Sequence, residues 1–142
     1  MAVDWGERRV GLAVSDPFGI IATGLETLAV RSRDDAVAQV AARALEVEAD
    51  RVVVGMPLLM SGERGEAARA AQDFAETLAV ALKIPVETYD ERLTSALSQR
   101  RLREVGVRTG HARERIDQGA AIVLLESFLL RMRSRDDGTK AP

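Results

Sequence analysis

The sequence predicts an α/β domain built around a mixed sheet. Two short apolar segments at the start are only four residues apart, the spacing of an antiparallel hairpin. From about residue 32, helical periodicity alternates with short β-branched runs, which is typical of parallel strands joined by helices. A length of 142 residues, with 46% apolar and 30% charged residues, is that of one globular domain.

Three strands are expected first, in antiparallel order. Residues 1–5 and 10–15 form the first two, and the turn between them covers 6–9. Asp16-Pro17-Phe18-Gly19 is a strong turn signal, so the third strand is expected over 22–30.

Helices and strands then alternate. The expected elements are a helix over 32–48, a strand over 51–55, a helix over 66–83, a strand over 86–89, a helix over 94–105 and a helix over 113–132. Ser32 is a good N-cap, and Pro85 ends the second helix. Val52-Val53-Val54 is typical of a strand buried on both faces. One domain is therefore expected over 1–133, followed by a frayed tail over 134–142.

The composition excludes several kinds of site. The chain has no cysteine and one histidine, His111, which excludes disulfides, thiol nucleophiles and thiolate zinc sites. A Ser-His-Asp triad would depend on that single imidazole. No apolar stretch approaches the ~20 residues of a membrane span, and no basic and apolar leader opens the chain. A cytoplasmic location is expected.

Four carboxylates stand out by their positions. Asp4 ends the first strand, Asp90 and Glu91 follow the strand 86–89, and Asp117 lies on the apolar stripe of the last helix. A carboxylate buried alone is costly, whereas several can share a cation. Oxygen ligands suit Mg²⁺ or Mn²⁺, which serve phosphoryl chemistry. Alternatively, Asp4 and Asp117 bind backbone amides, and Asp90 or Glu91 pairs with Arg92.

Other nucleotide and nucleic-acid motifs are weak or incomplete. Asp4-x-Gly6-x-x-x-x-Gly11 resembles the phosphate-binding hairpin of actin-like ATPases, but those proteins need two such domains. No P-loop sequence is present. Gly62-x-x-Gly65 matches the short KH motif, and aromatic residues, at 4%, are too few for a base-stacking platform.

Arginines are concentrated in one part of an otherwise acidic chain. The net charge is −2, yet seven arginines lie between residues 90 and 115: Arg92, Arg100, Arg101, Arg103, Arg108, Arg113 and Arg115. Such a cluster forms either a phosphate-binding face or a solvated helix surface.

Four segments together resemble the YqgF/RuvX family. They are Asp4-x-Gly6-x-x-Arg9-Val10-Gly11, Val53-Val54-Gly55-Met56-Pro57-Leu58 with Gly62, Asp90-Glu91-Arg92-Leu93-Thr94-Ser95, and Asp117-x-x-Ala120-Ala121. The resemblance implies an RNase H-like fold, similar to the resolvase RuvC, with a mixed five-stranded sheet flanked by helices. The family is described both as a Holliday junction resolvase and as a nuclease that processes the 5′ end of pre-16S rRNA.

Carried over to this chain, the resemblance implies metal ligands at Asp4, Glu91 and Asp117, and it favours Glu91 over Asp90. We expect a metal-dependent endonuclease of the Holliday junction resolvase type, which hydrolyses phosphodiester bonds in nucleic acid with Mg²⁺ or Mn²⁺. Arg9 and Arg92 are expected to hold flanking phosphates, and the track to continue over Arg100, Arg101 and Arg103. The alternatives are a pre-16S rRNA nuclease in ribosome biogenesis and a non-catalytic RNA-binding assembly factor.

The loop after residue 57 departs from the family pattern. It has Leu58-Leu59-Met60 where the family usually has polar residues. An exposed apolar run often marks a partner surface, although the run could also pack on the domain itself. A resolvase, which makes two symmetric cuts, is expected to act as a homodimer, whereas a monomer suffices for trimming an RNA end.

Overall fold

A computed structural model describes the backbone of residues 1–94 and 112–140, and the side chains of 1–94 and 119–135. Its centre is a mixed sheet in the order β3-β2-β1-β5-β6, with β4 paired to β2 beside this path. The strands are β1 (Ala2–Asp4), β2 (Arg9–Ser15), β3 (Ala22–Gly24), β4 (Leu28–Ala29), β5 (Val52–Met56) and β6 (Val86–Asp90). The antiparallel strands precede the parallel ones, as the sequence predicts.

The parallel strands meet at one edge of the sheet. β1 is parallel to β5, with Val3 opposite Val54, and β5 is parallel to β6, with Gly55 opposite Tyr89. The carboxyl ends of all three strands therefore lie on the same side. In open α/β sheets this is the edge at which ligands bind.

The third predicted strand is two strands in the structure. β3 pairs with the end of β2, where Val14 lies opposite Thr23, and β4 pairs with its start, where Arg9 lies opposite Ala29. Residues 25–27 between them leave the regular ladder. The sheet thus has six strands rather than the predicted five, although the architecture is unchanged.

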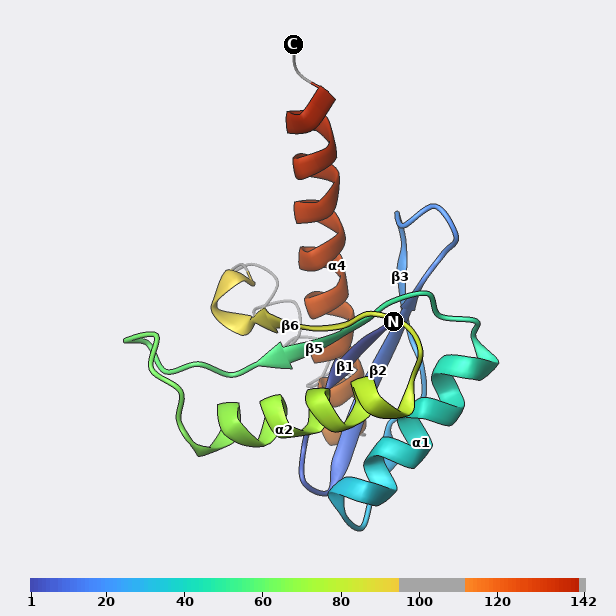
Figure 1. Cartoon of the computed structure of the whole chain (residues 1–142), viewed down its shortest axis with the longest axis vertical. Coiled ribbons are helices and arrows are strands. Elements are labelled where there is room, and N and C mark those ends of the chain that lie inside the picture. The colour runs from blue at the N-terminus through green and yellow to red at the C-terminus, as the bar shows by residue number, and fades with distance from the viewer. Residues whose placement is uncertain (95–111, 141–142) are drawn as a thin grey trace.

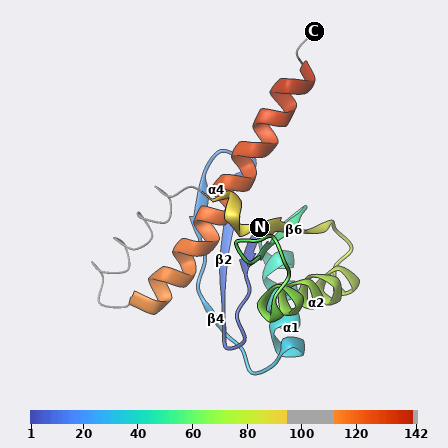
Figure 2. The same cartoon turned by 90° about the vertical axis from the view of Figure 1, so that its left-hand side faces the viewer.

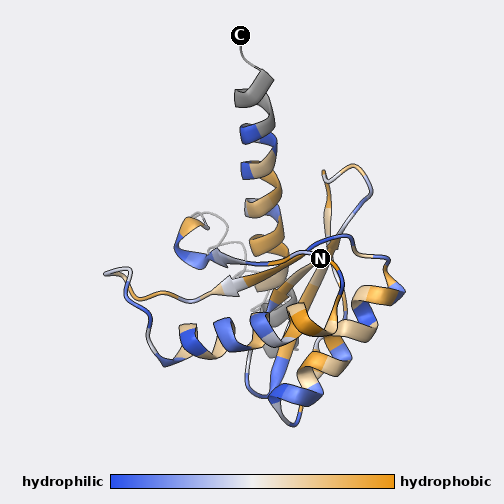
Figure 3. Ribbon diagram, in the orientation of Figure 1, coloured by the Kyte–Doolittle hydropathy of each residue, from blue (hydrophilic) through white to orange (hydrophobic). Residues whose placement is uncertain are grey.

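Helices cover both faces of the sheet (Figures 1 and 2). α1 (Arg33–Glu46) and α2 (Glu66–Ala81) lie on one face, and α4 (Ala112–Lys140) crosses the other. The two hydrophobic clusters divide β5 by its period of two: Val52 and Val54 face α1 and α2, and Val53 faces α4. Figure 3 shows apolar residues along the central strands and also along parts of α1, α2 and α4. The strand buried on both faces is confirmed.

The α4 face is built from small residues at the centre of the sheet. Ala2 of β1 and Ala13 of β2 are fully buried and share a cluster with Ala121 of α4, which is also fully buried. Alanines at this crossing let the helix backbone lie close to the strands. On the opposite face, the Trp5 ring stacks on Phe74 of α2 at 4.6 Å, which anchors the residue after Asp4.

The structure confirms the predicted N-cap of the first helix, but the last helix ends later than predicted. The Ser32 hydroxyl accepts the Asp35 N–H at 3.1 Å, which confirms the cap of α1. The last helix is longer than predicted: residues 134–140, expected to fray, have helical backbone that extends beyond the sheet (Figure 1). The helix predicted over 94–105 lies outside the described residues. None of the described helices combines the length and hydropathy needed to cross a bilayer.

Candidate active site

Two of the predicted carboxylates meet at the carboxyl edge of the sheet. Asp4 ends β1, and Glu91 begins η1 (Glu91–Leu93), the short helical turn that follows β6. β5 separates their strands, yet the two side chains are hydrogen-bonded to each other. Residues 87 positions apart in the chain therefore form one acidic pair.

Glu91 reaches Asp4 by lying across the backbone of Gly55. A Cβ atom added to Gly55 would be 2.5 Å from Glu91 Oε1 and 3.3 Å from its Cγ and Cδ. Any larger residue here would displace the carboxylate. Gly55 is a residue of the candidate site that the sequence analysis did not name as one. Its signal is a glycine inside a buried β-branched strand, which indicates a close approach.

The structure separates the roles of the two consecutive acids. Asp90 faces Arg92: the Arg92 Nε is 3.1 Å from both Asp90 carboxylate oxygens, and Nη2 is 2.7 Å from Oδ2. This pairing, which the sequence predicts for one of the two acids, lowers the pKa of Asp90. Glu91 is left to face Asp4.

Burial and a neighbouring charge oppose ionisation of Glu91. Desolvation raises the pKa of this carboxyl above its ordinary 4.5, the charge of Asp90 raises it further, and the hydrogen bond with Asp4 acts in the opposite direction. Two acidic groups thus share one partly buried site, and ionisation of both is opposed by desolvation and by repulsion. Such an arrangement is stabilised by a cation between them.

Glu91→Gln should stabilise the metal-free chain. The pKa of Glu91 is raised in the folded state, so the stabilising protonated form is complete below pH 4.5 and is lost as the pH rises through the folded-state pKa. The variant has no such charge to bury. Its melting temperature in EDTA should exceed that of the parent chain by about 3 °C at pH 8, and the difference should shrink towards pH 4.5. An equal difference at both pH values would contradict this origin.

The direction in which α4 crosses the sheet puts the backbone of Asp117 towards the carboxyl edge of the sheet. Arg51 Nη1, just before β5, is 3.5 Å from Met132 Sδ, so the later part of α4 lies at the amino edge of the sheet. Asp117 is one helical turn before Ala121, which packs beside Ala2. Ala2 and Asp4 are two residues apart and share the α4 face. The side chain of Asp117 lies outside the described residues.

Asp4 and Glu91 are the two expected ligands whose side chains the structure describes. Among the described side chains, no group of three or more histidine, cysteine, aspartate or glutamate residues gathers as a metal site. Asp4 and Glu91 form a pair on the α4 face, and α4, whose backbone includes Asp117, covers that face.

Of the predicted phosphate-binding arginines, the structure describes Arg9 and Arg92. Arg9 is exposed at the start of β2. Arg92 is engaged with Asp90, as described above. Arg100, Arg101 and Arg103 lie outside the described residues.

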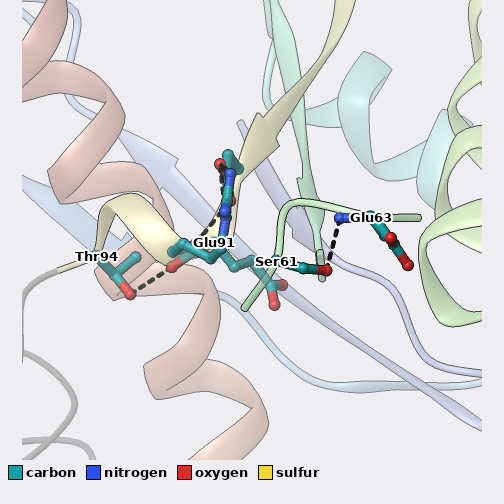
Figure 4. Close-up of polar contacts among 6 residues, drawn as sticks. Ser61, Glu63, Glu91 and Thr94 are labelled. Atoms are coloured by element: carbon teal, nitrogen blue, oxygen red, sulfur yellow. Dashed lines mark hydrogen bonds and ion pairs between the residues drawn. The ribbon is translucent and has the colours of Figure 1, made fainter. Parts of the chain in front are cut away.

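The turn carrying Glu91 is fixed by Thr94. The Thr94 hydroxyl donates to the Glu91 carbonyl oxygen at 2.8 Å, and its N–H points at the same oxygen at 3.2 Å. Figure 4 shows these two residues on the turn, with Ser61 and Glu63 on the neighbouring loop. In that loop the Ser61 hydroxyl accepts the Glu63 N–H at 3.3 Å. Thr94 therefore closes η1 at its carboxyl end.

Comparison with known protein families shows which family this chain belongs to. The family model described as "RuvX: Holliday junction resolvase" matches residues 1–131. The chain belongs to the RuvX family. This RuvX-family chain is therefore a nuclease by membership, and the predicted resemblance is confirmed.

Curated relatives support the assignment. A protein of Chloroflexus aurantiacus named "Putative pre-16S rRNA nuclease" is 44% identical over 134 residues, which cover 94% of this chain and 88% of that protein. A protein of Mycobacterium sp. strain KMS with the same name is 45% identical over 131 residues, covering 91% and 78% of the two chains.

Solved structures confirm the fold. Thermus thermophilus RuvC superposes with a TM-score of 0.52 at 19% identity, covering 92% of this chain and 94% of RuvC. RuvC of T. thermophilus in complex with a Holliday junction substrate gives a TM-score of 0.51 at 20% identity, with 92% of each chain covered. The predicted RNase H-like fold is therefore confirmed for this RuvX-family chain.

Proposed function

We propose that this chain is a divalent-cation-dependent endonuclease whose centre is formed by Asp4, Glu91 and Asp117. The observation that carries the proposal is the Asp4–Glu91 pair, which joins two distant segments across a glycine. Because Gly55 has no side chain, Glu91 can lie across the β5 backbone and reach Asp4.

The donor set fits Mg²⁺ or Mn²⁺. Both ions prefer oxygen ligands, and the pair offers carboxyl oxygens in a partly buried site. Among the described residues, the neighbouring Arg92 is paired with Asp90 rather than with Glu91. When bound, the cation would supply Lewis-acid activation of water and stabilisation of a leaving oxygen.

The chain's own residues would orient the reaction. Asp4 and Glu91 would hold the cation on the α4 face, and Asp117 would complete the set from the helix. Arg9, exposed next to the turn after Asp4, would bind a flanking phosphate of the substrate. Further along the nucleic-acid strand, the contact would be extended by Arg100, Arg101 and Arg103.

Two substrates are proposed for the same chemistry. A four-way DNA junction is one, because the fold is shared with RuvC, which has been solved with such a junction. The 5′ leader of pre-16S rRNA is the other, because relatives at about 44% identity are named for it. Both substrates occur in the bacterial cytoplasm, where we expect the chain to act.

A cleavage assay tests the proposal. Labelled four-way junction DNA and pre-16S leader RNA are incubated with the chain in Mg²⁺, Mn²⁺ or EDTA. We expect cleavage of at least one substrate with either cation and none in EDTA. Binding without cleavage in every buffer would instead support a non-catalytic assembly factor.

Assembly distinguishes the two substrates. Two symmetric cuts require two sites, so a resolvase should form a two-fold dimer on a junction, whereas a monomer could trim an RNA end. Leu59 and Met60, 52% and 92% exposed, offer an apolar surface for such a dimer. Sedimentation with and without junction DNA measures this. A chain that stays monomeric and binds junctions one to one favours the rRNA substrate.

Salt dependence tests the arginine track. Each phosphate contact on duplex DNA contributes about −0.9 to the slope of log K against log salt. Replacing Arg100, Arg101 and Arg103 together by Ala should reduce the magnitude of that slope by about 2–3. An unchanged slope in fluorescence anisotropy would show that these arginines form only a solvated surface.

A further inference from the structure

Arg92 is held between two parts of the site that are distant in sequence. On one side its guanidinium and backbone N–H bind Asp90, whose Oδ1 accepts the Arg92 N–H at 2.9 Å. On the other side it lies against the loop 57–65. A Cβ atom at Gly62 would be 3.4 Å from Arg92 Nη1 and 3.8 Å from Nη2.

The contacts around Arg92 are well defined. The side chains of Arg92 and Asp90 are 38% and 23% exposed, and the fork of Nε and Nη2 faces both carboxylate oxygens. Paired hydrogen bonds of this kind fix the plane of the guanidinium as well as its position. Gly62 adopts φ +87, a left-handed conformation that favours glycine and turns its backbone beneath Arg92.

The loop beyond Gly62 has its own closing bonds. The Gly62 N–H donates to the Leu59 carbonyl at 2.8 Å, and the Leu59 N–H donates to the Glu63 carbonyl at 3.0 Å. The loop is therefore a compact unit. Its residue Gly62 lies beside the guanidinium of Arg92, which belongs to the turn that begins at Glu91.

We propose that Arg92 is a positioning residue: paired with Asp90 and seated on Gly62, it joins the loop 57–65 to η1 and thereby fixes Glu91 over Gly55. The proposal rests on the proposed function only in taking Glu91 as part of the nuclease centre. It gives Arg92 a different role from the phosphate contact that the sequence predicts. Two of its three guanidinium nitrogens, Nε and Nη2, are already bound by the carboxylate of Asp90.

Lysine at this position separates the two roles. Arg92→Lys keeps the positive charge and so keeps most of a phosphate contact, but it loses the planar fork. If Arg92 positions Glu91, Arg92→Lys and Arg92→Ala should both lower kcat by about tenfold or more, with KM changed less than about twofold. If Arg92 binds phosphate, lysine should restore most of the activity.

Asp90 provides an independent variant, since a carboxylate does not bind phosphate. Asp90→Asn should reproduce the loss of kcat, and Asp90→Asn with Arg92→Lys should be no worse than either single variant. Additive losses would overturn the pairing. Arg64→Ala, which removes an exposed arginine from the same loop, is the matched control and should leave kcat unchanged.

A measurement without substrate keeps the proposal testable if no activity is found. Amide hydrogen exchange at Leu59 and Gly62 should accelerate about tenfold in Arg92→Lys and Asp90→Asn, and remain at the parental rate in Arg64→Ala. Unchanged exchange would overturn the link between loop and turn. Faster exchange in a chain that cleaves neither substrate would retain the link and reject the nuclease proposal.

Discussion

Asp4→Asn and Glu91→Gln should each lower cation-dependent cleavage by about 10³-fold or more, an effect typical of losing a group that stabilises developing charge. Both substitutions keep the size of the side chain and remove one charge from the pair at the carboxyl edge of the sheet. The loss should appear in kcat, while the affinity for nucleic acid in EDTA stays the same or rises, because a negative charge near the phosphates has been removed.

Asp73→Asn is the matched control. Asp73 is exposed on α2, and its ion pair among the described residues is a 3.9 Å surface contact with Arg33, so its neutral form should cleave at the parental rate. Asp117→Asn tests the third proposed ligand in the same assay. Full activity in that variant would remove Asp117 from the centre, whereas full activity in Glu91→Gln would reject the centre as proposed.

Cation binding gives a second measure of the same variants. Mg²⁺ or Mn²⁺ should raise the melting temperature of the parent chain, because a ligand that binds the folded state stabilises it by mass action. The rise should be much smaller in Asp4→Asn and Glu91→Gln and unchanged in Asp73→Asn. This readout does not depend on identifying the nucleic-acid substrate.

The fold could be predicted where local patterns are strong. Val52-Val53-Val54 indicates a strand buried on both faces, and its side chains do alternate between the two clusters. Ser32 begins α1 because its hydroxyl satisfies a free N–H of the first turn. The break between β3 and β4 could not be predicted, since Leu25-Glu26-Thr27 contains no proline or glycine that would mark an interruption of a strand.

Residue types and the positions of strand ends predict which edge of the sheet holds the site, but not which side chains meet there. A carboxylate at the end of each of two strands predicts a shared edge, which the parallel register of β1, β5 and β6 provides. The choice between Asp90 and Glu91 as the neighbour of Asp4 is a matter of side-chain direction at the end of β6. Arg92 takes up Asp90, and that pairing depends on backbone geometry that composition and spacing do not specify.

Gly55→Ala should lower kcat by about 10²-fold while leaving the fold nearly as stable as before. The new methyl group would be 2.5 Å from Glu91 Oε1, far inside van der Waals contact. The overlapping atom is at the end of a flexible side chain, so Glu91 can turn aside at little cost in stability. A carboxylate displaced by about 1 Å, however, is enough for a loss of that size.

A double substitution tests whether the methyl group acts through Glu91. Glu91→Ala removes the side chain that lies over Gly55, so adding Gly55→Ala to it should change neither the melting temperature nor the affinity for Mn²⁺. In the parent background, Gly55→Ala should weaken Mn²⁺ binding, measured by calorimetry. If Gly55→Ala weakens Mn²⁺ binding equally in both backgrounds, the methyl group disturbs the sheet edge rather than the carboxylate. Glycine at this position would then serve strand packing, and the close approach of Glu91 would have no role in holding the cation.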